Sequence, residues 1–496
     1  MPMSEHLIAQ LPAIALLVLL VASQATFLFG ARWAPIVAVA AAFAELAVAG
    51  VLAVTVATRG PLYYRIGGWG GPLGIDLRVD GLAALMILLA AVIGTAITVY
   101  ALGYFCDKER YRFFWPLWLL LWGSLVALFS SNDAFNLYVC LELVSVSAVA
   151  LVSLAGTRAA LAAAMRYLLA ALMGSIFYLL GVAMLYGAAG ALDISVLAQA
   201  AHDSVATQAG LALILVGLSV KTALVPLHFW LPPAHANAVT PVSAALSALV
   251  IKGSFYIALR LIFALDGADI MPGLPVVIGV MGAIAIVWGA IQAMAQVRLK
   301  MMVAYSTVAQ VGYLFVLFPL AAAGAGTDQA VVAVTAGGFH VVAHALAKAS
   351  MFLTAGSVLK AFGHDRIAEL GGMARRAPLL ALSFSVAGVS MIGLPPSGGF
   401  VTKWLYSSVA FTTGHWWWAL PVLAGGLLAG VYVFRVSGVF LREPDEGGES
   451  PVPLPWTMTW VPLTLAVASL LVGVLGQPIL DLITPAAQVM AAGVAL

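Results

Sequence analysis

The chain has 496 residues, of which 63% are hydrophobic and only 8% are charged. An ordinary soluble domain carries about 25% charged residues, so most of this apolar surface must face lipid rather than water. The net charge of +2 does not indicate the basic surface with which a nucleic acid is bound. The two cysteines, Cys106 and Cys140, are too few for an iron–sulfur cluster or a four-thiolate zinc site.

Apolar segments long enough to cross a bilayer recur along the whole chain. A spanning helix needs about 20 mostly apolar residues. Segments of this kind lie near residues 8–29, 34–57, 82–104, 113–130, 133–154, 166–188, 208–230, 239–264, 274–296, 301–320, 328–359, 379–410, 417–440 and 456–480. Those near 208–230 and 379–410 are interrupted by proline. The sequence predicts a single all-α membrane domain (1–496) with about fourteen transmembrane helices, two of them broken.

Basic residues alternate between the loops that this count places on opposite sides of the membrane. The loops assigned inside carry Arg32, Lys108, Arg110, Arg112, Arg158, Arg166, Arg298, Lys300, Lys360, Arg366, Arg375, Arg376, Arg435 and Arg442, and the others carry Arg59, Arg65, Arg78 and Arg260. Cytoplasmic loops carry an excess of Lys and Arg, so we expect a multi-pass protein of a bacterial cell membrane with its N-terminus outside. The longest hydrophilic stretches, 58–81 and 441–455, are too short to fold alone.

Glu142 is the first ionisable residue inside a span that we single out, within Asn136–Ser147. A charge inside a membrane costs a few kcal/mol and persists where it faces a protein or water-filled interior. A carboxylate there can exchange protons, although it can also form a static ion pair that only holds helices together.

Lys221 opens a run that contains Pro226, His228, Pro232 and His235. A proline within a helix removes a backbone hydrogen bond, and in lipid such a break is tolerated only where it lines a cavity. A buried lysine can cycle between charged and neutral forms, and a histidine can relay protons near neutral pH. A satisfied structural histidine is the alternative for His228. In the next span, Lys252 has no carboxylate within one helical turn.

His340, His344 and Lys348 follow one another at spacings of four. Residues four apart share one face of a helix, so these three form a polar ladder about 12 Å long. Two histidines with this spacing could instead ligate a metal or a haem, but such a site usually needs further ligands. The lysine on the same stripe favours proton relay, and we expect neither a metal nor another cofactor.

Lys403 ends the second interruption, Gly393–Lys403. Paired interruptions in the two halves of a transporter indicate inverted repeats around a central site. We therefore expect helices 4–8 (residues 113–264) to mirror helices 9–13 (residues 274–440), with Lys221 and Lys403 as equivalent residues. Helices 1–3 (residues 1–104) precede the repeats, and a C-terminal helix and tail (residues 456–496) follow them.

Four motifs together resemble the antiporter-like subunits of respiratory complex I, membrane-bound hydrogenases and Mrp cation/proton antiporters. They are Lys221–His235, the ladder His340–Lys348 with Met351–Gly356 after it, Gly393–Lys403, and Arg298–Gly312, which is similar to the family's "LKxxxAYSS" helix start. The length and the segment Gly67–Ile75 look most like the Mrp D-type subunit. Thr402 departs from the small residue that many relatives carry before the lysine.

The resemblance implies a fourteen-helix fold with an inverted five-helix repeat. It also implies a Glu142–Lys221 pair in a first half-channel, Lys252 and the histidine ladder as an inward link, and Lys403 as the gate of a second half-channel.

Three functions compete at this point. The first is a subunit of a Mrp-type Na⁺/H⁺ antiporter, with other membrane subunits, protons, Na⁺ and lipid as partners. The second is a proton-pumping subunit of a complex I or hydrogenase-type redox complex, in which other subunits carry the redox centres and this chain is not itself the enzyme. The third, a structural scaffold, does not explain four lysines and a glutamate within the spans.

Overall fold

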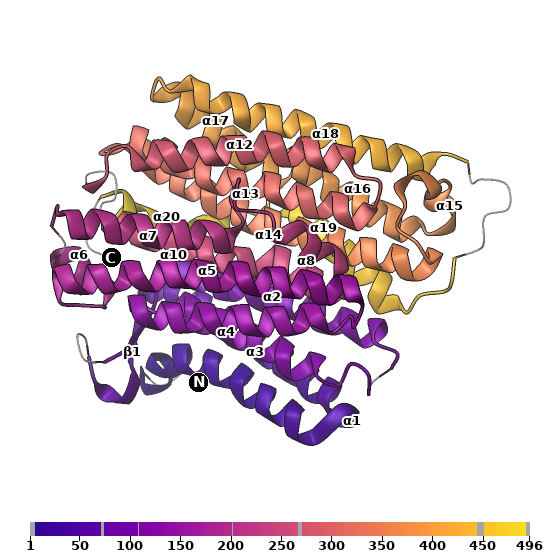
Figure 1. Cartoon of the computed structure of the whole chain (residues 1–496), viewed down its shortest axis with the longest axis horizontal. Helices are drawn as coiled ribbons and strands as arrows, with labels where there is room; N and C mark the ends of the chain where they lie inside the picture. Colours follow the sequence, from indigo (N-terminus) through magenta and orange to yellow (C-terminus); the bar gives the residue numbers. More distant parts are fainter. Residues whose placement is uncertain are drawn as a thin grey trace.

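Long, nearly parallel helices packed into one bundle make up almost the whole protein (Figure 1). The computed structural model describes residues 5–70, 74–107, 109–200, 202–265, 270–443 and 451–492. Its helices are α1 (Glu5–Arg59), α2 (Gly81–Tyr104), α3 (Phe114–Ser130), α4 (Ala134–Ser153), α5 (Arg158–Ala189), α6 (Ile194–Ala200), α7 (Val205–Thr222), α8 (Leu231–Asn237), α9 (Thr240–Ala245), α10 (Ile251–Ala264), α12 (Leu274–Ala295), α13 (Leu299–Ala323), α14 (Asp328–Phe362), α15 (Met373–Arg376), α16 (Pro378–Ile392), α17 (Gly398–Thr412), α18 (Ala419–Leu441), α19 (Trp456–Leu471) and α20 (Gln477–Ala491).

The helices confirm the predicted all-α membrane fold. Among the described residues, ten helical stretches are long and apolar enough to cross a membrane, and the shorter apolar helices α3, α16 and α19 accompany them. Helix α1 folds back on itself at Gly30, whose φ of 71° is readily adopted only by glycine. The side chains of Glu5 and Arg59, at its two ends, are consequently only 2.7 Å apart. Two predicted spans are thus joined in α1.

A small β-hairpin at one end of the bundle was not predicted from the sequence. Strands β1 (Leu62–Arg65) and β2 (Asp76–Val79) pair antiparallel, with Leu62 opposite Val79. In Figure 1 this hairpin and α6 lie at the end of the bundle opposite to α15. The hairpin occupies the stretch 58–81, in which hydrophilic composition alone predicted only a loop.

The opposite ends of the bundle carry the loops that the charge pattern assigned to opposite sides. Arg65 lies in the hairpin, and Arg375 and Arg376 lie in α15 at the other end. Lys108, residues 71–73 of the segment Gly67–Ile75, and residues 444–450 of the stretch 441–455 lie outside the described residues. The orientation of the N-terminus stays a prediction.

The loop predicted for Arg260 is wrong, because this residue lies within α10 and is buried. Its guanidinium forms two hydrogen bonds of 2.5 Å with the two carboxylate oxygens of Asp80. Asp80 also caps α2 by accepting a hydrogen bond from the Ala83 amide. The pair therefore ties the start of α2 to α10. Burial opposes ionisation of Asp80, but the charge of Arg260 outweighs burial and holds the pKa of this carboxyl below its usual value.

Both predicted helix breaks are present, and in each a side chain from beyond the break bonds to a carbonyl before it. The first helix, α7, ends before Ala223, which is in the left-handed conformation (φ 58°), and the Trp230 indole donates a hydrogen bond of 2.8 Å to the Val220 carbonyl. The second, α16, ends before Gly393 (φ 85°), and the Lys403 ammonium donates one of 3.1 Å to the Met391 carbonyl. These bonds replace those that the break removes.

Lys221 and Lys403 lie at different places relative to their breaks. Lys221 is the penultimate residue of α7 and precedes its break. Lys403 is the sixth residue of α17 and follows its break. The two lysines therefore lie on opposite sides of their breaks along the chain, and their equivalence stays a prediction.

We predict that Asp80→Asn strongly destabilises the protein. Asparagine can still cap α2, but it leaves the Arg260 charge buried without its counter-charge, which costs about 3–5 kcal/mol. Because the pKa of Asp80 is lower in the folded state, its stabilising effect is present above the unfolded pKa, about 4, and is lost as the pH falls through the folded value. Thermal unfolding in detergent at pH 7 and in acid measures both effects.

The matched control is Glu5→Gln, which breaks the exposed Glu5–Arg59 pair at the same end of the bundle and should change the melting temperature little. Equal melting temperatures of the two variants at pH 7 would contradict the assignment.

We predict that Trp230→Phe lowers stability by about 1 kcal/mol, the net contribution of one buried hydrogen bond, because the Val220 carbonyl then keeps only the 3.1 Å bond from the Ala223 amide. Phenylalanine retains the stacking of this ring on Tyr167, whose centroid is 4.3 Å away. The control is Trp288→Phe on α12, where the indole is 44% exposed on the surface of the bundle. A melting temperature lowered as much by the control as by Trp230→Phe would show that the hydrogen bond is unimportant.

Candidate functional site

Glu142 and Lys221 form an ion pair inside the bundle. Their side chains come from α4 and α7, and the Lys221 ammonium lies 2.9 Å from a Glu142 carboxylate oxygen. The Lys221 side chain is almost completely buried, whereas that of Glu142 is 23% exposed. This pair brings together two residues that the sequence singles out in different spans.

Two serines complete the surroundings of this pair. The Ser145 hydroxyl accepts a hydrogen bond of 3.0 Å from Lys221, and the Ser175 hydroxyl of α5 donates one to Glu142. Helices α5 and α7 approach closely because Gly174 lies against the backbone of α7, where an added Cβ atom would be 2.8 Å from the Gly217 carbonyl oxygen. Both hydroxyls can rotate, so they can follow a change in the protonation of the pair.

Lys252 lies deeper in the bundle, directly after a π-helical segment, Leu246–Val250. Such segments are rare and are frequent at functional sites. The Lys252 ammonium donates a hydrogen bond of 2.9 Å to the Ser247 carbonyl within this segment. In the part of the chain that the structure describes, no carboxylate lies within 4 Å of it. Thr222, next to Lys221, bonds to Ser254 near Lys252 at 3.0 Å.

The predicted polar ladder lies along α14 and is fully buried. The rings of His340 and His344 stack with their centroids 5.5 Å apart and an interplanar angle of 13°. His340 Nε2 is 3.0 Å from the Gln310 carbonyl oxygen of α13. Lys348 donates to the Val303 carbonyl at 3.0 Å and to the Ser306 hydroxyl. Both ends of the ladder therefore contact α13.

His344 lies in the middle of the ladder, between His340 and Lys348. Neither of its ring nitrogens has a hydrogen-bond partner among the described residues, and buried groups of this kind are usually satisfied by ordered water. The charges of Lys252, Lys348 and Lys403 all act on this ring. The ladder consequently lies between Lys252 in one half of the bundle and Lys403 in the other.

Lys403 lies at the second break and is the last residue in this series of buried ionisable groups. Its ammonium lies 4.9 Å from the centroid of the Tyr313 ring, and this ring lies 5.2 Å from that of His340. Tyr313 is therefore a bridge between Lys403 and the ladder. Lys403 also lines a cavity of 810 Å³ between α17 and α18, whose wall includes the exposed Trp404.

The two histidines after the first break differ in their surroundings. His228 is half-buried between exposed Pro226 and Phe229, at the edge of the bundle. His235 in α8 is completely buried, and the charges of Lys348, Lys300 and Lys252 act on it. The structure thus brings His235, rather than His228, next to the buried lysines.

Several polar residues of this region could not be identified from the sequence. Ser145, Ser175, Ser306, Gln310 and Tyr313 are common residue types in apolar spans, and nothing in the sequence indicates which of them contact the buried ionisable residues. Glu45 in α1 is different, because a carboxylate within the span near 34–57 is as conspicuous as Glu142.

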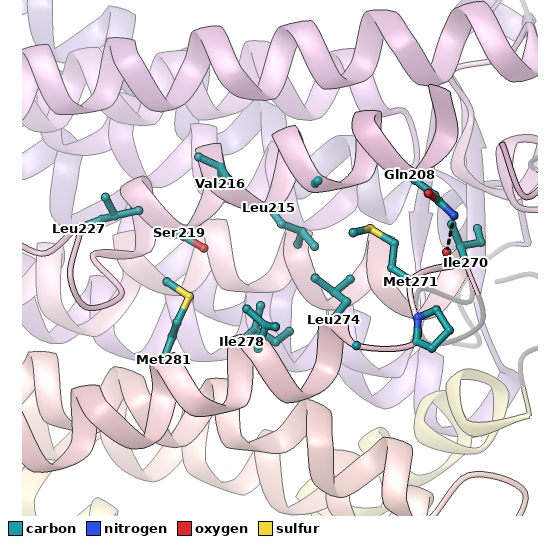
Figure 2. A pocket seen from close by; sticks show the side chains of 14 residues that line it. Gln208, Leu215, Val216, Ser219, Leu227, Ile270, Met271, Leu274, Ile278 and Met281 are labelled. Carbon is teal, nitrogen blue, oxygen red and sulfur yellow. Dashed lines mark hydrogen bonds between the residues drawn. The ribbon is translucent and has the colours of Figure 1, made fainter. Parts of the chain in front are cut away.

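An apolar groove of 560 Å³ between α7 and α12 is separate from the buried ionisable residues described above (Figure 2). Leu215, Met271 and Leu274 are among the side chains that line it, and Gln208 at one end donates a hydrogen bond of 3.1 Å to the Ile270 carbonyl. This lining suits an acyl chain and not an ion.

Comparisons with known proteins show the family to which this chain belongs. A family model described as "NADH:quinone oxidoreductase/Mrp antiporter, TM" matches residues 131–429, and one described as "NADH-Ubiquinone oxidoreductase (complex I), chain 5 N-terminus" matches residues 70–114. The N-type subunit of the NADH-quinone oxidoreductase of Desulforudis audaxviator is 36% identical over 463 residues, which cover 89% of this chain and 90% of the relative.

Two further proteins extend the likeness. The D-type subunit of the Na⁺/H⁺ antiporter of Bacillus subtilis is 28% identical, with 84% of this chain and 82% of the relative covered. A chain in the structure of the Mrp complex from Dietzia sp. shares the fold, with a TM-score of 0.88, 24% identity, and coverage of 98% of this chain and 99% of that one. The chain belongs to the family of antiporter-like membrane subunits shared by NADH:quinone oxidoreductases and Mrp antiporters.

Proposed function

We propose that this chain is a proton-translocating subunit of a multisubunit membrane complex. The observation that carries the proposal is the Glu142–Lys221 pair, which is partly exposed at Glu142 and lies beside a helix break. A buried ion pair contributes little to stability by itself, and ionisable groups within a membrane usually mark an ion pathway. The pair is the beginning of a series of buried ionisable groups that ends at Lys403.

Lys221 and Glu142 can exchange one proton without leaving a charge uncompensated. In the ion pair, Lys221 holds the proton. When the proton moves to the Glu142 carboxylate, both groups become neutral, and the 2.9 Å contact is retained as a hydrogen bond. When it moves inward instead, the remaining neutral amine can be protonated again through Glu142.

The histidine ladder can carry a proton between Lys252 and Lys403. The Gln310 carbonyl can only accept a hydrogen bond, so His340 carries its hydrogen on Nε2 and leaves Nδ1 as the acceptor. A proton that arrives at Nδ1 of His340 must leave again from Nδ1, because the Nε2 hydrogen stays on the Gln310 carbonyl; at His344, uptake at one nitrogen can be balanced by release from the other. His344, with both nitrogens free of partners among the described residues, can serve as the intermediate station.

Two assemblies are candidates for the partners of this subunit. In a Mrp-type antiporter the proton would be exchanged for Na⁺, and the Bacillus subtilis relative is a subunit of a Na⁺/H⁺ antiporter. In a redox-driven complex, oxidation of a reduced substrate by quinone or another acceptor, carried out by other subunits, would supply the energy. The higher identity, 36% against 28%, favours the second assembly. The same residues of this chain would move the proton in both.

We predict that Lys221→Met and Glu142→Gln abolish proton flux by the assembled complex in membrane vesicles, because each removes one member of the exchanging pair. Flux is measured as the change in fluorescence of a pH-sensitive dye after addition of Na⁺ or of the reduced substrate. Glu5→Gln, which alters an exposed pair far from the polar chain, should retain flux. Wild-type flux in both pair variants would refute the proposal.

Co-purification should distinguish the two assemblies. A tagged copy of this chain, extracted in mild detergent from its own organism, should carry with it iron–sulfur or flavin subunits, because the higher identity is to a redox-complex subunit. Absorption spectra and mass spectrometry of the purified complex provide the measurement. Recovery of small membrane subunits alone, without a redox chromophore, would assign the chain to a Mrp-type antiporter.

A further inference from the structure

Lys300 is a buried lysine that the proposed pathway does not use. The charge pattern placed it in a loop, but it is the second residue of α13 and is only 3% exposed. Its ammonium donates a hydrogen bond to the Ala238 carbonyl, at the end of α8. A lysine with so little exposure at a helix start is unusual, because lysine side chains near helix ends normally extend to the membrane surface.

The backbone of Lys300 contacts an ion pair at the surface of the bundle. Asp365, in the loop after α14, accepts a hydrogen bond from the Lys300 amide at 3.3 Å and forms an ion pair with Arg298 at 2.8 Å. The Arg298 side chain is 43% exposed, whereas that of Asp365 is 5% exposed. The Arg298–Asp365 pair is therefore the boundary between the exposed surface and the buried Lys300.

The ammonium of Lys300 bonds to Ala238, which is close to His235 in the chain. Ala238 directly follows α8, and His235 lies one helical turn earlier in the same short helix. Neither ring nitrogen of His235 has a partner within the described ranges, although the ring is completely buried. Lys300, Lys348 and Lys252 all act electrostatically on this ring. His235 thus lies between Lys300 and the buried lysines of the pathway.

We propose that Lys300 transfers protons between the surface at the Arg298–Asp365 pair and His235. This inference rests on the proposed function, for which it supplies a route between the buried chain and one side of the membrane. In the inward step, an N–H bond of the Lys300 ammonium breaks and one forms on a ring nitrogen of His235, directly or through water. The neutral amine then regains a proton from surface water by way of the Asp365 carboxylate or intervening water, so that one positive charge has moved inward.

A purely structural role makes a different prediction. The last carbonyls of a helix lack intrahelical donors, and Lys300 could simply satisfy one of them. Arginine at this position would keep the positive charge and the donor to Ala238, but it cannot release its proton. Histidine would lose the reach of lysine but can exchange protons near neutral pH.

The decisive experiment compares Lys300→Arg, Lys300→His and Lys300→Met in the assembled complex in vesicles. We expect Lys300→Arg and Lys300→Met to lower proton flux at least about tenfold, corresponding to about 1.4 kcal/mol in the barrier. Lys300→His should restore part of the flux, with its optimum at a lower pH than that of the wild type. The matched controls are Lys360→Arg and Lys360→Met, because Lys360 also donates to backbone carbonyls, those of Gly103 and Tyr104.

The outcomes separate this inference from the proposed function. Wild-type flux in Lys300→Arg, with Lys221→Met inactive, would show that Lys300 only caps α8 and would overturn the inference alone. Wild-type flux in Lys300→Met and Lys221→Met together would overturn both. If Lys300→Met does not assemble, Lys300→Arg decides, because it retains the hydrogen bond and the charge. Equal loss of flux in the Lys360 variants would also count against a specific role.

Discussion

The bilayer contains no water that could satisfy an open backbone group, and this constraint decides where the helices of this protein can break. Each break leaves carbonyls without their helical donors, so each must be accompanied by a side chain that replaces them. Trp230 does this at the first break, and Lys403 does it at the second. At the second break the replacing group is itself ionisable. The residue that completes the backbone bonding there is thus also the residue proposed to receive the proton.

The same constraint explains how several lysines can lie buried without carboxylates. Four of them donate to backbone carbonyls: Lys252 to Ser247, Lys300 to Ala238, Lys348 to Val303 and Lys403 to Met391. A carbonyl accepts a hydrogen bond from an ammonium and from a neutral amine alike. A buried ion pair, by contrast, loses its Coulombic attraction when one member is neutralised. Carbonyl partners therefore suit residues that are protonated and deprotonated in each transport cycle.

The features that depend on neighbouring residues in the chain could be predicted from the sequence. Apolar length located the spans, proline and glycine located the breaks at Ala223 and Gly393, and spacing located the ladder on α14. Features that depend on contacts between distant segments were not predicted. Arg260 was assigned to a loop because it lies near the end of its predicted span, and its partner Asp80, 180 residues away, is not visible from the neighbouring sequence.

The individual residues of the site could be predicted from the sequence, but their arrangement, which depends on contacts between distant segments, could not. An ionisable residue inside an apolar span is conspicuous, so Glu142 and the buried lysines could be identified individually. Their order could not, because it depends on which faces of the helices meet. The resemblance to known subunits implies the Glu142–Lys221 pair, and the sequence offers His235 as a possible proton relay, but Lys300 acquires a role only from its contact with Ala238 beside α8.

The distribution of charge limits how this chain of residues can carry protons. Glu142 is the only carboxylate paired with one of the pathway lysines among the described residues, so the resting positive charge is best compensated at Lys221. Lys252 and Lys348 are close enough to repel each other when both are charged, and no carboxylate of the described residues forms an ion pair with either of them. Protonating both would require two uncompensated charges in a medium of low dielectric constant. In the proposed mechanism, transfer along the ladder therefore proceeds one proton at a time, and each proton leaves the Lys252–Lys348 region before the next one enters it.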